Sequence, residues 1–179
     1  MPRLDNIYQT VADRDNPDYV EANGPFLCVN NPWLGIGYYF WDNLMTRAHW
    51  WGKKHYNGQY IICQASANID DDKYLDLAGN MEQLKYFEQC CSALRENYHQ
   101  EHITVSLVIA KLIRIGNFPY QAVRVLSEYC GGDDIMHFVD YSNSFLNFSP
   151  PMQICIFEKR RIVDYHIIYP DKYILEGFI

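Results

Sequence analysis

The stretch WLGIGYYFWDNLMTRAHWWG, residues 33–52, is dense in aromatic side chains and constrains the fold more than any other part of the chain. The two glycines of GIG permit a tight backbone path and let a ligand approach the main chain closely. Residues 38–40 on a strand would point alternately to opposite faces. Asp42 could cap a short helix that runs to about Gly52. The stretch is therefore either a piece of core or the wall of a pocket for a flat, aromatic ligand.

Tyr39 and Trp50 decide between these two interpretations. If they face each other across a gap, the slot between them suits a planar heterocycle, because stacking adds about 1 kcal/mol per ring beyond the burial of area. Large aromatic residues are nevertheless found mostly in protein interiors. From the residues alone, core packing is the favoured interpretation.

Length and composition fit one folded domain over residues 1–179, with 49% hydrophobic and 21% charged residues. No apolar run is long enough to span a membrane. The first residues, MPRLDNIYQTVADRD, lack the apolar segment of a secretory signal, so we expect a cytoplasmic protein. A net charge of −7 with no basic stripe argues against a nucleic-acid partner.

The six cysteines give no sign of a metal site or a disulfide framework. Cys28, Cys63 and Cys155 lie in apolar, strand-like runs, where a free thiol acts as a small hydrophobic side chain. The sequence has no C-x-x-C pair and no HxxxH motif. We expect buried, reduced thiols and no bound metal.

The order of elements predicts an α+β fold. Helices in the middle of the chain and strands at its end favour this class over alternating βαβ units. One predicted helix begins with an Asn-x-x-Gln box at Asn80, and the other begins at Thr104 and stops at Gly116. Strands are predicted over 59–67, 121–129, 135–140, 152–157, 163–168 and 173–178, with the basic cluster 158–162 as a hairpin turn.

A resemblance to a known family changes the interpretation of the aromatic stretch. GIGYYFWDNLMTRAHWW resembles the GxGxYFAD…SxxY segment of the poly(ADP-ribose) polymerases and related ADP-ribosyltransferases. The residues in register are Gly35, Gly37, Tyr39, Phe40 and Asp42. Trp50 takes the place of the second stacking aromatic, and Arg47 stands where the family has a small Ser that binds the nicotinamide carboxamide. The resemblance implies that Tyr39 and Trp50 hold the nicotinamide ring of NAD between them.

Two further segments are similar to the same family. IYQT (7–10) is similar to its YHGT strand, with Gln9 where His is usual and Thr10 in register. FPYQAVRVLSEY followed by PMQICIFEKRRIVDYHII is similar to the C-terminal half of small bacterial ADP-ribosyltransferase-like domains, which puts Gln153 at the position of the catalytic Glu. The three segments occur in the family's order and cover roughly half of the chain.

This resemblance implies an ADP-ribosyltransferase-like split β-sandwich of two small sheets with helices alongside. NAD would be a substrate rather than a permanently bound cofactor, as in intracellular toxins, and a protein acceptor or a cognate antitoxin would be a further partner. The implied catalytic residues are Gln153 and Tyr39, and the implied NAD-binding residues are Gln9, Thr10, Gly37, Tyr39, Arg47 and Trp50.

The family's reaction breaks the bond between nicotinamide and ribose, and a carboxylate stabilises the cationic sugar. Gln153 can supply a hydrogen bond but not that charge. The expected function is therefore ADP-ribosyl transfer to a macromolecule or NAD hydrolysis. One alternative is a catalytically inactive member that binds a nucleotide or a protein. Another is a plain interaction domain with the aromatic stretch in its core.

Four other residues have open roles. Glu128 is a candidate neighbour of Gln153, whereas Glu158 is not expected to substitute for the missing carboxylate. His49 is either a hydrogen-bonding group of the site or, as we favour, a packed edge residue. Arg124 is either a phosphate contact or, slightly favoured, part of a solvated strand face.

Overall fold

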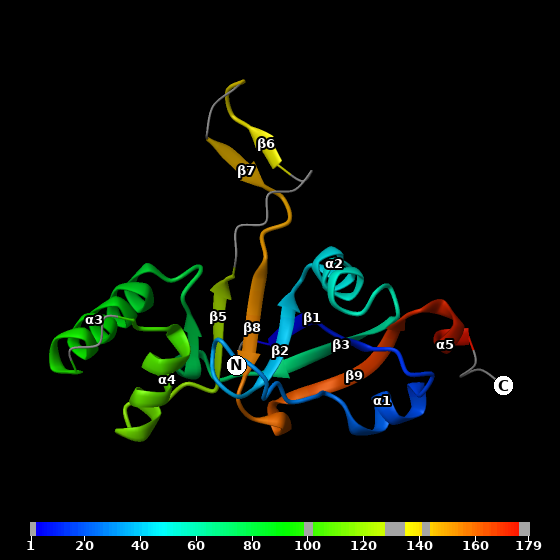
Figure 1. Cartoon of the computed structure of the whole chain (residues 1–179), viewed down its shortest axis with the longest axis horizontal. Coiled ribbons are helices and arrows are strands. Elements are labelled where there is room, and N and C mark those ends of the chain that lie inside the picture. Colours follow the sequence, from blue (N-terminus) through cyan, green and yellow to red (C-terminus); the bar gives the residue numbers. More distant parts are fainter. Residues whose placement is uncertain (1–2, 99–101, 128–134, 141–143, 176–179) are drawn as a thin grey trace.

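The computed structural model describes residues 3–98, 102–127, 135–140 and 144–175. It has a mixed α+β architecture, which confirms the predicted class (Figure 1). The strands are β1 (Arg3–Ala12), β2 (Tyr38–Asp42), β3 (Tyr60–Asn68), β4 (Tyr74–Asp76), β5 (Ala122–Leu126), β6 (Ile135–His137), β7 (Phe145–Asn147), β8 (Met152–Ile156) and β9 (Ile162–Tyr169). The helices are α1 (Pro17–Asn23), α2 (Met45–His55), α3 (Met81–Tyr98), α4 (Val105–Arg114) and α5 (Asp171–Leu175). In these ranges no helix is both long and apolar enough to cross a membrane.

Seven strands form one sheet in the order β4-β5-β8-β2-β1-β3-β9, in which only β4 and β5 are parallel neighbours. β1 pairs with β3 along nearly its whole length, but it pairs with β2 only through Ile7–Asp42 and Tyr8–Trp41. We call β4, β5, β8 and β2 the β2 wing, and β1, β3 and β9 the β1 wing. The expected pair of small sheets is thus a single sheet with a narrow junction between two wings.

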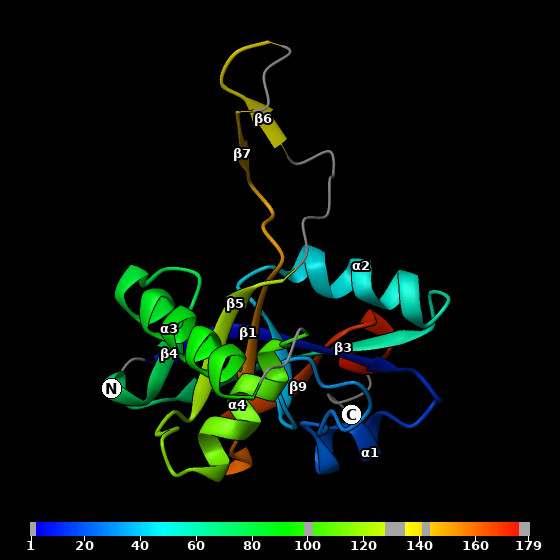
Figure 2. The same cartoon turned by 60° about the vertical axis from the view of Figure 1, so that its left-hand side comes forward.

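Helices cover the sheet in separate groups (Figures 1 and 2). α3 and α4 pack on the β2 wing, where Ile109 and Leu112 meet Val123 in one apolar cluster. α2 lies at the junction of the wings, and its Ala48 packs with Trp41 in another cluster. Helix α2 therefore lies over the place where β1 and β2 separate.

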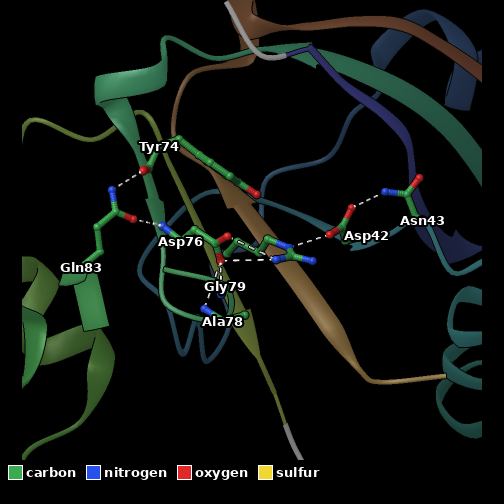
Figure 3. A network of polar contacts seen from close by, with 8 residues as sticks. Asp42, Asn43, Tyr74, Asp76, Ala78, Gly79 and Gln83 are labelled. Carbon is green, nitrogen blue, oxygen red and sulfur yellow. Dashed lines mark hydrogen bonds and ion pairs between the residues drawn. The ribbon is translucent and has the colours of Figure 1, made fainter. Parts of the chain in front are cut away.

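A polar network ties the strands of the β2 wing together (Figure 3). Arg124 on β5 donates from Nε to the Asp42 carboxylate on β2 at 2.6 Å, and from Nη1 to the Asp76 carboxylate on β4 at 3.3 Å. Gln83 of α3 donates to the carbonyl of Tyr74 and accepts from the main-chain N–H of Asp76. Arg124 is thus an ion-pairing residue of the sheet that is only partly exposed, and two carboxylates rather than a phosphate hold its guanidinium.

Strands β6 and β7 pair only with each other and stand away from the rest of the fold as an arm (Figures 1 and 2). The arm belongs to the connection between β5 and β8, which are themselves paired neighbours in the large sheet. Several large apolar side chains between β6 and β7 and on these strands are exposed, among them Phe138 at 71% and Val139 at 67%. None of the described arm residues, 135–140 and 144–148, belongs to the apolar clusters of the large sheet.

Most predicted elements are confirmed, with shifted ends. The predicted strand at 59–67 is β3, and the two central helices are α3 and α4, the latter capped by the Thr104 hydroxyl. The remaining confirmed strands are β5, β6, β8 and β9. The Asn80 side chain caps α3, but the reciprocal bond of a capping box is missing because Gln83 bonds to β4 instead.

Three local predictions are wrong. Of the strand predicted over 173–178, residues 173–175 belong to helix α5, which Pro170 immediately precedes, and residues 176–178 lie outside the described ranges. Residues 158–162 do not close a hairpin, because β9 pairs with β3 while β8 pairs with β2 and β5. Asp42 does not cap α2, which begins at Met45, since its carboxylate is bonded to Arg124.

The ion network gives a stability prediction. Replacing Arg124 with Ala leaves the Asp42 carboxylate, whose side chain is only 9% exposed, without its cation. We expect Arg124→Ala to lower the free energy of unfolding by about 2–3 kcal/mol, less than a fully buried pair because Arg124 is partly exposed. Urea denaturation measures the change.

Arg160→Ala is the matched control, because Arg160 pairs with Glu158 at an exposed position. This variant should change the free energy of unfolding by less than about 1 kcal/mol. Equal effects of the two substitutions would contradict the structural role of Arg124.

Candidate functional site

The two wings separate beyond the β1–β2 junction, and Gln9 lies at the opening. Its Nε2 donates to the carbonyl of Phe26 at 3.0 Å and to that of Tyr39 at 3.4 Å. Its Oε1 accepts from the N–H of Phe26 at 2.8 Å and from the Tyr165 hydroxyl at 3.1 Å. A carboxamide has two donor hydrogens and two acceptor lone pairs, so all four are used within the protein. Gln9 therefore tethers β1, β2, β9 and the segment around Phe26, and leaves no group of its own for a ligand.

Two other residues expected to bind NAD also have structural contacts. The Thr10 hydroxyl donates to the carbonyl of Ala48 at 2.9 Å and so ties β1 to α2. Gly37 accepts a main-chain bond from Cys28 at 2.9 Å, and a Cβ at this position would collide with the Cys155 sulfur. Glycine is required at residue 37 by the close approach of β8.

Tyr39 fixes the loop that precedes its own strand. Its hydroxyl accepts from the N–H of Leu34 at 2.8 Å and donates to the carbonyl of Gly35 at 2.9 Å. Gly35 has a φ of 99°, a conformation that favours glycine, so the tight path expected of this segment is present. Burial raises the pKa of Tyr39. Its hydroxyl is therefore a neutral anchor for the loop.

Arg47 and Trp50 extend from α2 toward different parts of the structure. The Arg47 guanidinium donates from Nε and Nη2 to the carbonyl of Ser149, and the side chain is buried. It holds the segment before β8 and lines neither cavity described below. Trp50 packs edge-on against Trp41, with ring centroids 6.4 Å apart.

Two adjoining cavities open along the separated strands. The first chamber, about 390 Å³, lies between β1 and β2. It is lined by Tyr8, Gln9, Thr10, Val11, Phe26, Leu27, Cys28, Asn30, Asn31, Trp33, Tyr39, Phe40, Trp41, Trp51, Tyr56 and Gln153. The second chamber, about 430 Å³, is lined by Trp33, Trp41, Trp50, Trp51, Lys54, His55, Ser127 and Gln153. Four residues line both, so we treat the chambers as one aromatic cleft.

Tyr39 and Trp50 line different chambers. Tyr39 belongs to the first and Trp50 to the second, so they do not form the two walls of one slot. The aromatic residues common to both chambers are Trp33, Trp41 and Trp51. The stretch 33–52 therefore belongs partly to the core and partly to the wall of the cleft. Trp41 is only 6% exposed, whereas Trp33 is 38% exposed.

Gln153 lies where the two chambers meet. On β8 it is opposite Trp41 of β2 in the sheet, and its side chain is largely buried. Its Oε1 accepts from Trp33 Nε1 at 2.9 Å. Within the described ranges no protein group accepts from its Nε2, so this N–H₂ can donate to a molecule in the cleft. Gln9, Thr10 and Gln153 all line the first chamber, but the side-chain donors of Gln9 and Thr10 are used within the protein, whereas Gln153 keeps a donor for a ligand.

The remaining candidates lie elsewhere. Glu128 is outside the residues that the structure describes. Glu158 pairs with Arg160 and Arg161 and lines neither chamber. His49 shares a 2.9 Å hydrogen bond with the Tyr60 hydroxyl, and burial lowers its pKa. These contacts make His49 a packed residue of α2, as favoured.

Sequence reasoning missed part of the cleft. Trp33, Trp41 and Trp51 are in the quoted stretch, but their shared position depends on how β2, α2 and the preceding loop pack. Lys54 was missed too, although it follows Trp50 by one helical turn, where its Nζ lies 4.7 Å from the ring centroid. The i, i+4 spacing of Trp50 and Lys54 could have indicated that these two side chains lie together in the second chamber.

Comparisons with protein-family models, with curated proteins and with solved structures found no match to this chain. The described part of the chain contains no group of three or more His, Cys, Asp or Glu side chains arranged to hold a metal ion.

The contacts of Gln9 give a prediction that separates a structural from a ligand-binding role. Gln9→Ala removes all four hydrogen bonds and leaves main-chain groups of Phe26 without partners, so we expect a loss of about 2 kcal/mol of unfolding free energy. Thermal or urea denaturation in the absence of ligand measures this loss. Gln59→Ala, at an exposed position, is the control and should change stability by less than about 0.5 kcal/mol. A Gln9→Ala variant as stable as the native protein would contradict the tether.

Proposed function

We propose that this chain binds NAD, with the nicotinamide ring in the first chamber. The observation that carries the proposal is the lining of that chamber: aromatic rings and neutral amides, with no charged side chain among its described residues. The nicotinamide of oxidised NAD is a planar, cationic ring with a carboxamide. Aromatic faces attract a cation, and the amides of Asn30, Asn31 and Gln153 can pair with the carboxamide.

Gln153 makes binding a better-supported function than rapid catalysis. Its amide can donate a hydrogen bond to a ribose hydroxyl, but it supplies no negative charge to an oxocarbenium-like transition state. Loss of one preorganised electrostatic group costs roughly 100- to 1,000-fold in rate in enzymes where it has been measured. We therefore propose an NAD-binding module of ADP-ribosyltransferase type.

The second candidate function is slow ADP-ribosyl transfer or NAD hydrolysis. It is favoured by one specific observation: Gln153 stands at the junction of the chambers with its N–H₂ available to a ligand. In this case the same cleft binds NAD and also releases nicotinamide.

Trp33 provides the test of NAD binding. It lines both chambers and is 38% exposed, so its removal should disturb the fold little. We expect NAD to quench tryptophan fluorescence, and Trp33→Ala to weaken its binding about tenfold, since one aromatic–base stack contributes about 1–3 kcal/mol. Calorimetric titration gives the two dissociation constants.

Phe138→Ala is the matched control, because this ring is exposed on the arm and lines neither chamber. It should bind NAD as the native protein does. Alkylation of Cys28, which lines the first chamber, offers an independent measure and should be slowed by NAD. The absence of calorimetric heat and of Cys28 protection would rule out the proposal.

Gln153→Glu tests the catalytic candidate. A Glu at this position can still accept from Trp33 Nε1, and it adds the charge that the reaction needs. We expect nicotinamide release from NAD to rise at least about tenfold over the native protein, measured by chromatography of the products. Gln59→Glu, which makes the same chemical change at an exposed site, should leave the rate unchanged. If the Gln153→Glu protein binds NAD but cleaves it no faster than the native protein, residue 153 does not lie at the reacting bond.

A further inference from the structure

The second chamber differs from the first in chemistry. Four residues belong to it alone: Trp50, Lys54, His55 and Ser127. Lys54 and His55 are on the last turn of α2. The chamber therefore combines indole rings with basic side chains, whereas the first chamber is lined by uncharged residues.

The indole rings of the second chamber form a corner. Trp41 and Trp50 are nearly perpendicular, at 89°, while Trp51 is tilted by 56° to Trp41 and by 52° to Trp50. Rings at such angles do not cover one another's faces as stacked rings do. Trp33 also lines this chamber and is 38% exposed, so ring surface remains for a planar ligand. A base stacked on an aromatic ring adds to the binding affinity whichever base it is.

The basic groups are held in place by the same rings. Lys54 Nζ lies 4.7 Å from the centroid of the Trp50 ring, and His55 stacks on Trp51 with centroids 3.8 Å apart. The cation–π contact fixes the ammonium at the chamber without neutralising its charge. Among the described lining residues no Asp or Glu offsets Lys54. The chamber thus favours an anion, although the whole chain carries a net charge of −7.

We propose that the second chamber binds a nucleotide: a planar base on the indole rings, with its phosphate at Lys54. The other occupants suited to an aromatic corner fit less well. A quaternary ammonium ligand would be repelled by Lys54, and a purely apolar ligand would leave the ammonium unused. An anionic group attached to a flat ring satisfies both features of the chamber.

This nucleotide is bound beside NAD rather than being part of it, and that detail rests on the proposed function. Trp33, Trp41, Trp51 and Gln153 form the boundary that the chambers share. A nicotinamide ring in the first chamber and a base in the second would lie on either side of Gln153. The cleft is in this sense a two-ligand site.

Lys54→Gln and its neighbour Lys53→Gln form the test pair. Both lysines are exposed residues of α2, but only Lys54 lines the chamber. We expect calorimetry to show AMP binding to the native protein, about tenfold weaker binding to Lys54→Gln, and no change in Lys53→Gln, since a hydrogen bond to a charged group contributes about that much. Adenosine, which lacks the phosphate, should bind Lys54→Gln and native protein equally.

A second titration with AMP in saturating NAD tests whether the two ligands bind together. Retained AMP binding is expected. Displacement of AMP by NAD would overturn the inference, because the chamber would then hold half of NAD itself. No AMP binding, or equal losses in both lysine variants, would overturn it as well. If AMP binds in a Lys54-dependent way but NAD does not bind, the second chamber stands as a nucleotide site and the proposal for the first chamber fails.

Discussion

Strands β1 and β2 pair through two residue pairs only, Ile7–Asp42 and Tyr8–Trp41, and the cleft follows from this short junction between the wings of the sheet. Paired strands leave no space between them, because neighbouring strands lie about 5 Å apart. Beyond the junction β1 continues along β3, while β2 continues along β8. Main-chain groups exposed by this separation need other partners. The Gln9 side chain supplies one partner by donating to the Tyr39 carbonyl, and its bonds to Phe26 hold that segment beside the opening.

The chemistry available in the cleft depends on which side chains are already used to hold its walls. The side-chain donors of Gln9, Thr10 and Arg47 bind main-chain carbonyls, so the walls of the cleft are held by hydrogen bonds within the protein. What remains for a ligand is mostly ring surface, a few amides and two basic side chains. Such a site selects a ligand mainly by its flat ring, and to a lesser extent by its charge.

Sequence reasoning predicted the regular elements better than their connections. The helices over 81–98 and 105–114 have clear periodicity and side-chain caps, and β3 is a continuous apolar run, so local signals were enough. Whether β8 and β9 form a hairpin depends on which strand each one pairs with, which a basic turn does not encode. The helix after Pro170 was missed because YILEGF also has the apolar residues of a strand.

The candidate site shows the same limit. Gln153 was found because its strand could be matched to a motif, and it does reach the cleft. The pairing of Tyr39 with Trp50 was expected from their positions in one motif, but Tyr39 lines the first chamber and Trp50 the second. Of the two adjacent tryptophans of α2, it is Trp51 that reaches the first chamber as well. Arg124 could not be assigned, because its carboxylate partners come from two strands distant in sequence.

The arm between β5 and β8 has a consequence for how freely this chain can change. β5 and β8 are already fixed beside each other by five paired residues, so the segment between them closes a loop whose ends are held. Doubling the length of such a loop costs only about 0.6 kcal/mol of closure entropy. The arm can therefore be lengthened, shortened or exchanged while Gln153, the second residue of β8, keeps its place. One cleft can in this way be combined with many different arms.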